Sequence, residues 1–241
     1  MKIVSLLPST TEICFALGLG GSVFGVTHEC DYPAAARSLP QLTRNVLPAG
    51  EYSSAEIDRM VAERVLNGCA IYDLDVALLA ALEPDLILTQ ALCPVCAVSY
   101  DDVVGAAAAL PRMPRVAAFE PHTVADIIAS IAEVARLAGV PEQGDRLCTQ
   151  LTDRIAAVQR RVVALPAVRV LCLEWLDPPM VGGHWVPEMV RLAGGIDVLG
   201  VAGQPSVPVS WPEVEASDPD MIVLMPCGFD LPATVEVAAE L

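Results

Sequence analysis

Glu83-Pro84-Asp85-Leu86-Ile87-Leu88 returns later in the chain as Asp218-Pro219-Asp220-Met221-Ile222-Val223-Leu224. In each copy a short acidic turn leads into an apolar run of the length that is typical of a buried strand. The strand patterns at 2–7 and 168–173 repeat in the same way, because each is followed by a helical pattern. The order of these motifs predicts two α/β lobes of matching topology, with a ligand cleft between them.

The alternation of strand and helix patterns predicts parallel sheets with helical crossovers. We expect an N-terminal lobe at 1–120, a helical linker at 121–165 and a C-terminal lobe at 166–241. The linker contains a helical pattern at 142–164 that would be about 35 Å long at 1.5 Å per residue, which is enough for a rigid spine between the lobes. The alternative is two ordinary crossover helices on one continuous sheet.

The individual strands and helices can be placed from apolar runs and helix-start signals. Ser9, Ser53 and Ser210 each precede a glutamate by three residues, as Thr123 precedes Asp126, and this spacing is typical of a helix cap. The expected strands are 2–7, 23–27, 86–90, 115–119, 168–174, 197–201 and 221–225. The expected helices are 10–18, 54–65, 74–82, 99–109, 124–138, 142–164, 186–193 and 211–216.

Composition excludes several classes of function. The formal net charge is −16 and only 14 of 241 residues are Lys or Arg, so a phosphate-binding surface for nucleic acid is not expected. The chain lacks an apolar run of 18 residues that could span a membrane. The run Ile3 to Leu7 stops at Pro8, which is too short for a signal peptide, and predicts a cytoplasmic protein with reduced thiols. A periplasmic or membrane-associated location is the alternative if the N-terminus is incomplete.

A first candidate site follows two strands of the N-terminal lobe. His28 and Cys30 come after the strand at 23–27, and Cys93-Pro94-Val95-Cys96 comes after the strand at 86–90. Because the carboxyl ends of parallel strands share one edge, these loops are expected to approach one another. The set of His28, Cys30, Cys93 and Cys96 could bind zinc, act as a redox dithiol, or supply reduced thiols to a pocket wall.

A second candidate site lies in the C-terminal lobe, which holds all three tryptophans. Trp175, His184 and Trp185 lie on one connection after the strand at 168–174, Trp211 opens a later helix, and Phe229 follows the last strand. Aromatic rings gathered at the ends of strands form a wall that suits a flat ligand. The simpler interpretation is that Trp175 and Trp185 fill the core.

The order of the motifs resembles the vitamin B12 and ferric-siderophore class of ABC-transporter substrate-binding proteins, and most of all its cobalamin-binding branch. The resemblance covers nearly the whole chain and includes Ile3 to Glu12, Asp31-Tyr32-Pro33, Pro84 to Ile87, Ala193-Gly194-Gly195 and Ser210 to Val214. It implies two Rossmann-like lobes joined by one rigid helix. It also implies a further strand and helix beyond Leu241, so the second lobe is expected to be truncated.

The resemblance further implies a binding protein rather than an enzyme, with cobalamin or a related corrinoid as ligand and an ABC permease as partner. Glu12 and Glu188 are the candidates for docking to the permease, and His28 or His184 for coordinating the cobalt. The alternative is a cytoplasmic zinc or thiol-redox protein. We expect ligand contacts from His28, Glu29, Tyr32, Cys93, Trp175, His184, Trp185 and Trp211.

Overall fold

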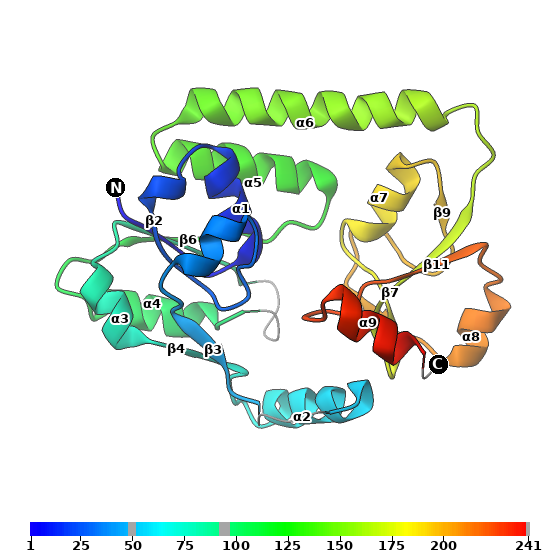
Figure 1. Ribbon diagram of the computed structural model, residues 1–241, viewed down its shortest axis with the longest axis horizontal. Helices are drawn as coiled ribbons and strands as arrows, with labels where there is room; N and C mark the ends of the chain where they lie inside the picture. The colour runs from blue at the N-terminus through cyan, green and yellow to red at the C-terminus, as the bar shows by residue number, and fades with distance from the viewer. Residues whose placement is uncertain (48–51, 92–96, 240–241) are drawn as a thin grey trace. The chain divides into compact units, whose positions relative to one another are not determined.

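The computed structural model describes residues 1–47, 52–91 and 97–239. The chain divides into two compact units, which are described one at a time (Figure 1). Unit 1 comprises residues 1–49, 60–120 and 129–148, and unit 2 comprises residues 50–59, 121–128 and 149–241.

Unit 1 is built on a four-stranded parallel sheet with the strand order β2-β1-β5-β6. Its strands are β1 (Ile3–Ser5), β2 (Val23–Val26), β5 (Leu86–Thr89) and β6 (Arg115–Ala118). Both faces of β1 and β5 are buried, as expected for parallel strands that are covered by helices on both sides. Each fully buried Leu or Ile in this core contributes about 1.5–3 kcal/mol to stability.

The remaining elements of unit 1 surround this sheet. An antiparallel pair, β3 with β4, forms a separate two-stranded sheet, and Leu42 at its start is fully buried in the same core as Ile87. Three further helices, α2, α5 and α6, contribute residues to both units. The bounds are α1 (Pro8–Ala16), η1 (Gly20–Ser22), η2 (Ala34–Ser38), β3 (Thr43–Asn45), α2 (Ser54–Leu66), β4 (Tyr72–Leu74), α3 (Val76–Leu82), α4 (Tyr100–Ala108), α5 (Val124–Leu137) and α6 (Pro141–Val162).

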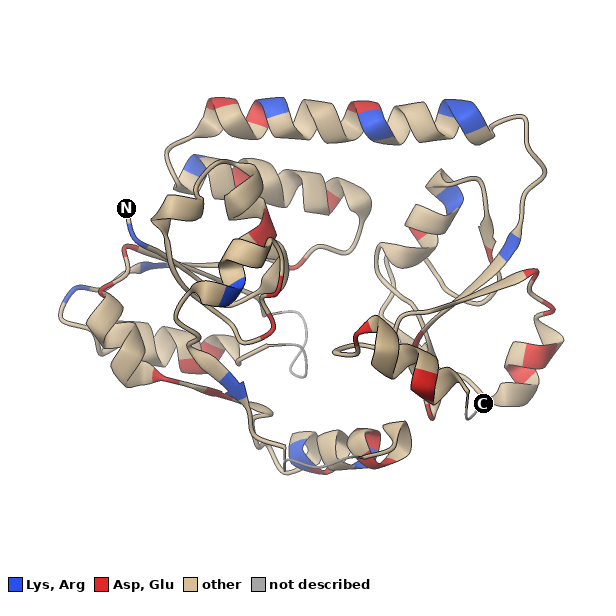
Figure 2. Cartoon of the chain, in the orientation of Figure 1, with Lys and Arg blue, Asp and Glu red and all other residues tan. Residues whose placement is uncertain are grey.

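Helix α6 is one uninterrupted helix of 22 residues, which confirms the long helix that the sequence predicts. Figure 2 shows acidic colour at its first turn and basic colour at its last turn, where Glu142 and the pair Arg160–Arg161 lie. Charges placed in this order stabilise a helix, because its dipole is positive at the N-terminus and negative at the C-terminus.

Unit 2 is built on a mixed five-stranded sheet with the path β10-β8-β7-β11, and β9 also pairs with β7. The sequence predicts a parallel sheet here, but the observed sheet is mixed. The reason is that β8 follows β7 directly in the chain and pairs with it in the antiparallel direction. Two separate sheets also rule out the alternative of one continuous sheet in the described chain. The bounds are β7 (Arg169–Leu176), β8 (Pro179–Val181), α7 (Val186–Leu192), β9 (Ile196–Asp197), β10 (Val207–Pro208), α8 (Trp211–Ala216), β11 (Met221–Leu224) and α9 (Leu231–Ala238).

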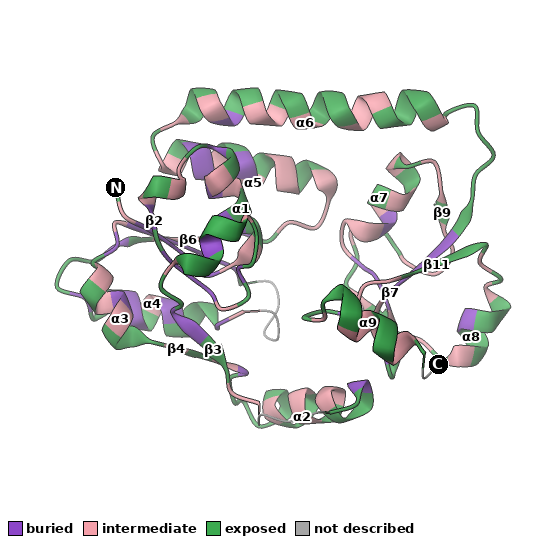
Figure 3. Ribbon diagram, viewed as in Figure 1, coloured by how far each residue is buried: buried purple, intermediate pink, exposed green. Residues whose placement is uncertain are grey.

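Burial differs between the inner strand β7 and the edge strand β11 of unit 2. Leu171 and Leu173 of β7 are fully buried, whereas Met221, Ile222 and Val223 of β11 are exposed (Figure 3). The core of this unit therefore lies around β7, β8 and α8 rather than around the last strand.

Three of the four predicted helix caps are confirmed. Ser53 and Ser210 each exchange hydrogen bonds with the glutamate three residues later, and Thr123 does so with Asp126. The cap at Ser9 is wrong, because α1 already begins at Pro8 and has no side-chain cap. In the described part of the chain, no helix has the length and apolar character needed to cross a bilayer.

Candidate functional site

The carboxyl edge of the sheet in unit 1 gathers polar side chains from several connections. Open parallel sheets bind ligands at this edge, because the connections leave the strands there. Thr27, His28 and Glu29 follow β2, the buried Gln90 follows β5, and α1 begins just after β1.

His28 is held by the hydroxyl of Thr43. The Nδ1 of the imidazole lies 2.7 Å from Thr43 Oγ1, and the backbone N–H of His28 donates to the same oxygen at 3.1 Å. Thr43 in turn donates its hydroxyl proton to Thr27 Oγ1 at 2.8 Å. Since Thr43 gives its proton to Thr27, the oxygen of Thr43 is left to accept hydrogen bonds from His28, and it holds the imidazole in place.

The other side of the His28 ring faces a carboxylate and an aromatic ring. Nε2 lies 3.1 Å from Glu29 Oε1 without forming an aligned hydrogen bond, and Tyr72 packs against the ring at a centroid distance of 5.4 Å. The neighbouring imidazole lowers the pKa of Glu29. Glu29 is therefore a stable negative charge at this edge.

Cys30 belongs to a buried hydrogen-bond network. Its side chain is 2 % exposed, and its Sγ lies 3.1 Å from Thr11 Oγ1, which donates to Ser5 Oγ at 2.8 Å. Burial raises the pKa of the thiol, so the protonated form predominates at neutral pH. This arrangement makes Cys30 a poor thiolate donor in the conformation described.

Two of the four predicted metal ligands, His28 and Cys30, lie in the described part of the chain. Cys93 and Cys96 lie outside the described residues, and so the predicted contact between Cys93 and the ligand stays a prediction. In the described chain, no group of three or more His, Cys, Asp and Glu side chains is arranged to hold a metal ion. His28 and Cys30 are engaged with Thr43 and Thr11 respectively.

Tyr32 and Glu12 are two further exposed residues near this edge. Tyr32 is 65 % exposed, so its ring is available to a ligand. Glu12 is exposed on α1, and partial burial together with the charge of Asp31 raises its pKa. An exposed carboxylate of this kind can still pair with a cationic partner at neutral pH.

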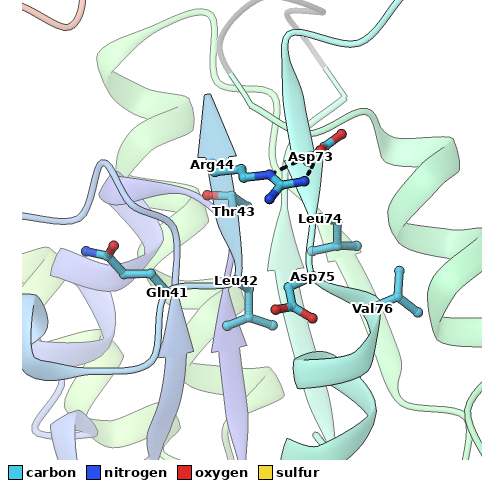
Figure 4. A pocket seen from close by; sticks show the side chains of 8 residues that line it. All are labelled: Gln41, Leu42, Thr43, Arg44, Asp73, Leu74, Asp75 and Val76. Carbon is cyan, nitrogen blue, oxygen red and sulfur yellow. Dashed lines mark hydrogen bonds and ion pairs between the residues drawn. The ribbon is translucent and has the colours of Figure 1, made fainter. Parts of the chain in front are cut away.

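A cavity of about 310 Å³ lies beside the His28 network and is lined by residues 41–44 and 73–76, in and next to the paired strands β3 and β4 (Figure 4). Arg44 and Asp73 form an ion pair at 2.7 Å across its rim. Thr43 belongs both to the cavity wall and to the hydrogen bonds of His28. The cavity is therefore polar at its rim and connected through one hydroxyl to the carboxyl edge of the sheet.

The carboxyl edge of the sheet in unit 2 carries a pair of aromatic rings. Trp175, near the end of β7, meets Phe229 edge to face at a centroid distance of 5.4 Å. Both rings are half-buried, and the indole N–H donates to Asp177 O at 3.1 Å. Because this hydrogen bond is satisfied locally, the pair leaves an apolar surface for a ligand.

Trp211 stands at the first position of α8, next to the cap formed by Ser210 and Glu213. It is half-buried and packs against the core cluster that contains Val214 and Leu176. Trp211 therefore contributes to the core of unit 2 and keeps only part of its ring accessible.

His184 and Trp185 are separated from Trp175 by β8, which the sequence does not reveal. β8 runs antiparallel to β7, and Gly182 N donates to Cys172 O at 2.9 Å. The chain after β8 thus heads toward the start of β7, whereas Trp175 lies near its end. The single aromatic connection expected from the sequence is wrong in this respect.

Glu188 is largely engaged within unit 2. Its Oε2 accepts a hydrogen bond from Val124 N at 2.8 Å, and its Oε1 pairs with Arg191 at 3.3 Å. Its side chain is 23 % exposed. A carboxylate in this position stabilises the N-terminus of α5.

Two residues of these surroundings, Thr43 and Tyr72, are absent from the predicted site. Thr43 and Tyr72 reach His28 through β3 and β4, for which the sequence carries no strong pattern. Phe229 was recognisable as an aromatic residue on a connection after β11. Its contact with Trp175 depends on the pairing of β7 with β11.

Comparisons with family models, with curated proteins and with solved structures all point to periplasmic binding proteins. A family model described as "Periplasmic binding protein" matches residues 3–238. The vitamin B12-binding protein of Photorhabdus laumondii is 23 % identical, with 93 % of this chain and 70 % of the relative covered.

Solved structures share the fold. The periplasmic vitamin B12 binding protein of Vibrio cholerae has a TM-score of 0.65 at 20 % identity, over 92 % of this chain and 75 % of its own. A periplasmic heme-binding protein from Roseiflexus sp. RS-1 has a TM-score of 0.65 at 26 % identity, over 93 % and 76 %. A periplasmic heme binding protein from Pseudomonas aeruginosa has a TM-score of 0.72 at 18 % identity, over 99 % and 76 %.

These matches overturn the cytoplasmic location expected from the sequence, because the matching family is one of periplasmic proteins. The expectation relied on the residues at the start of the chain, which do not decide the compartment. The argument that reducing conditions keep the thiols free therefore loses its basis. Among the described residues, Cys14, Cys30, Cys69 and Cys172 are nevertheless free thiols.

Proposed function

The chain belongs to the periplasmic binding protein family, and we propose that it binds cobalamin or a closely related flat metal-tetrapyrrole for delivery to an ABC importer. Relatives named vitamin B12-binding protein and structural neighbours named heme-binding protein support this class of ligand. Relatives of this kind bind a substrate without transforming it, so we propose no catalytic role.

The observation that carries the proposal is the ring pair of Trp175 and Phe229 at the carboxyl edge of unit 2. A corrin or porphyrin offers a broad apolar face, and burial of that face against aromatic rings is favourable. In unit 1 we propose Tyr32 and Glu29 as contacts. The exposed ring can pack on the ligand, and the carboxylate can accept hydrogen bonds from polar groups at its periphery.

A visible-absorbance titration of the purified chain tests this function. We expect hydroxocobalamin to change its spectrum, to saturate at one ligand per chain and to stay with the protein through gel filtration. Hemin is titrated in parallel. If the protein retains hemin and not cobalamin, the ligand is a heme, which belongs to the same class of flat metal-tetrapyrroles. Unchanged spectra and no retained ligand with either compound would reject the proposal.

We also propose that Glu12 docks to a cationic side chain of the permease, with Glu188 as the second contact. Glu12 is exposed and free to pair, whereas Glu188 would have to exchange Arg191 for a partner residue. Glu12→Gln is expected to reduce permease-dependent uptake while cobalamin affinity stays unchanged. Loss of ligand affinity in this variant would contradict a docking role.

A further inference from the structure

We propose that His122 and His184 form a binding site for a divalent transition-metal ion such as Zn²⁺, separate from the tetrapyrrole contacts. Both residues belong to unit 2, and their imidazole centroids lie 5.5 Å apart with a tilt of 50° between the rings. Imidazole nitrogen is a favoured ligand of zinc, copper and nickel.

The separation of the two rings suits one shared ion. With a metal–nitrogen distance of about 2.0–2.1 Å, a ring centroid stands roughly 3.2 Å from the metal. Two such rings at a tetrahedral angle have centroids about 5.2 Å apart, which is close to the observed 5.5 Å. The separation of the two centroids is therefore compatible with both rings binding the same ion.

The ring nitrogens of this pair are unoccupied by other described residues. The hydrogen bonds of His122 and His184 within the described chain are made by backbone atoms: His122 N donates to Asp126 Oδ2 at 3.0 Å, and His184 N donates to Gln204 O at 2.6 Å. His28 differs, because its Nδ1 is already engaged by Thr43 at 2.7 Å.

The backbone of His184 is held in an unusual conformation. Its φ of 51° lies in the left-handed region, which a non-glycine residue adopts at a cost that surrounding contacts must offset. The contacts here are its N–H to Gln204 and its carbonyl, which accepts from Gly203 N at 2.8 Å. The backbone of His184 is thus held in place before any ion binds, which reduces the entropy lost on binding.

The charges around the pair favour a cation. Asp126 caps the segment that carries His122, and Glu188 bonds to Val124 on the same segment. Arg191 pairs with Glu188 and offsets part of this negative charge. Since no third His, Cys, Asp or Glu ligand is arranged around the pair among the described residues, we propose that water molecules fill the remaining positions around the ion.

An imidazole ¹⁵N NMR titration of the full chain with Zn²⁺ tests the proposal, because the chain has three histidines. The signals of His122 and His184 are expected to shift together and to saturate at one zinc per pair, while the signal of His28 stays in place as an internal control.

Single variants give the second arm of the experiment. His122→Gln and His184→Asn, in which Asn tolerates the left-handed backbone, are each expected to weaken zinc binding at the remaining histidine by at least about tenfold. An unchanged affinity in either folded variant overturns the shared site. Absence of zinc-induced shifts at His122 and His184 in the parent chain overturns it as well. Both readouts are independent of cobalamin binding.

Discussion

The indole of Trp175 meets the ring of Phe229 edge to face, at a centroid distance of 5.4 Å. The two residues are brought together because β7 and β11 pair in parallel and both connections leave the sheet at the same edge. Cys227 N reinforces this geometry by donating to Glu174 O at 3.2 Å. The aromatic surface is therefore a product of sheet pairing.

Trp175→Ala should weaken cobalamin binding by about 2 kcal/mol, or roughly thirtyfold, because tryptophans that pack against a ligand dominate binding energy. Isothermal titration calorimetry gives the affinity directly. Trp185→Ala is the matched control, since Trp185 follows β8, which runs back toward the other end of β7. The cobalamin affinity of this variant should remain close to that of the parent chain. Equal losses in both variants would contradict the proposed contact surface.

Thr43→Val should destabilise unit 1 by about 1–3 kcal/mol, because the N–H and the ring nitrogen of His28 lose their shared partner while remaining partly buried. Urea unfolding followed by circular dichroism measures this change. Thr43→Ser keeps the hydroxyl and should recover most of the stability. If Val and Ser behave alike, the hydroxyl does not hold His28.

The pH dependence of stability should report the contact between His28 and Glu29. The imidazole lowers the pKa of Glu29 in the folded chain, so the contact contributes stability above the unfolded value of about 4.3 and loses it as the pH falls through the lower folded value. The contribution should not exceed about 1 kcal/mol, because the carboxylate is 40 % exposed.

Two variants isolate this contact. Both His28→Gln and Glu29→Gln should make the free energy of unfolding fall less steeply with decreasing pH below about 4.3. A slope identical to that of the parent in both variants would show that the contact does not affect folding.

Cysteine labelling should follow burial. Cys14 is fully buried and its pKa is raised to about 12, and burial raises the pKa of Cys172 to about 11. Iodoacetamide should therefore modify the exposed Cys69 in the folded chain, and Cys14 and Cys172 only after unfolding. Peptide mass spectrometry distinguishes the sites, and early modification of Cys14 would contradict the packing around α1.

Much of the fold follows from the sequence, because its core strands are continuous apolar runs between clear turn signals. The strands β1, β5 and β7 and the helices α2 and α8 lie within a few residues of the predicted ranges. The elements that escape prediction are the short ones. β4 and β8 have three residues each, and such segments gain their stability from neighbours that are distant in sequence.

The candidate site was less predictable for the same reason. A residue such as Glu29 or Trp175 is recognisable because it follows a strand, but its partner is chosen by tertiary pairing. Thr43 lies 15 residues from His28, and its hydrogen bond depends on β3 leaving the main sheet to pair with β4. In the same way, β8 runs antiparallel to β7, and so Trp185 does not lie at the sheet edge where Trp175 is found.

The three tryptophans allow the central claim to be measured with one experiment, a ¹H–¹⁵N NMR titration of the indole N–H signals with diamagnetic cyanocobalamin. Trp175→Phe assigns its signal. We expect the Trp175 signal to show the largest shift and to saturate at one ligand per chain, with little change for Trp185. Indole signals that stay in place throughout, or a shift confined to Trp185, would contradict binding at this aromatic edge.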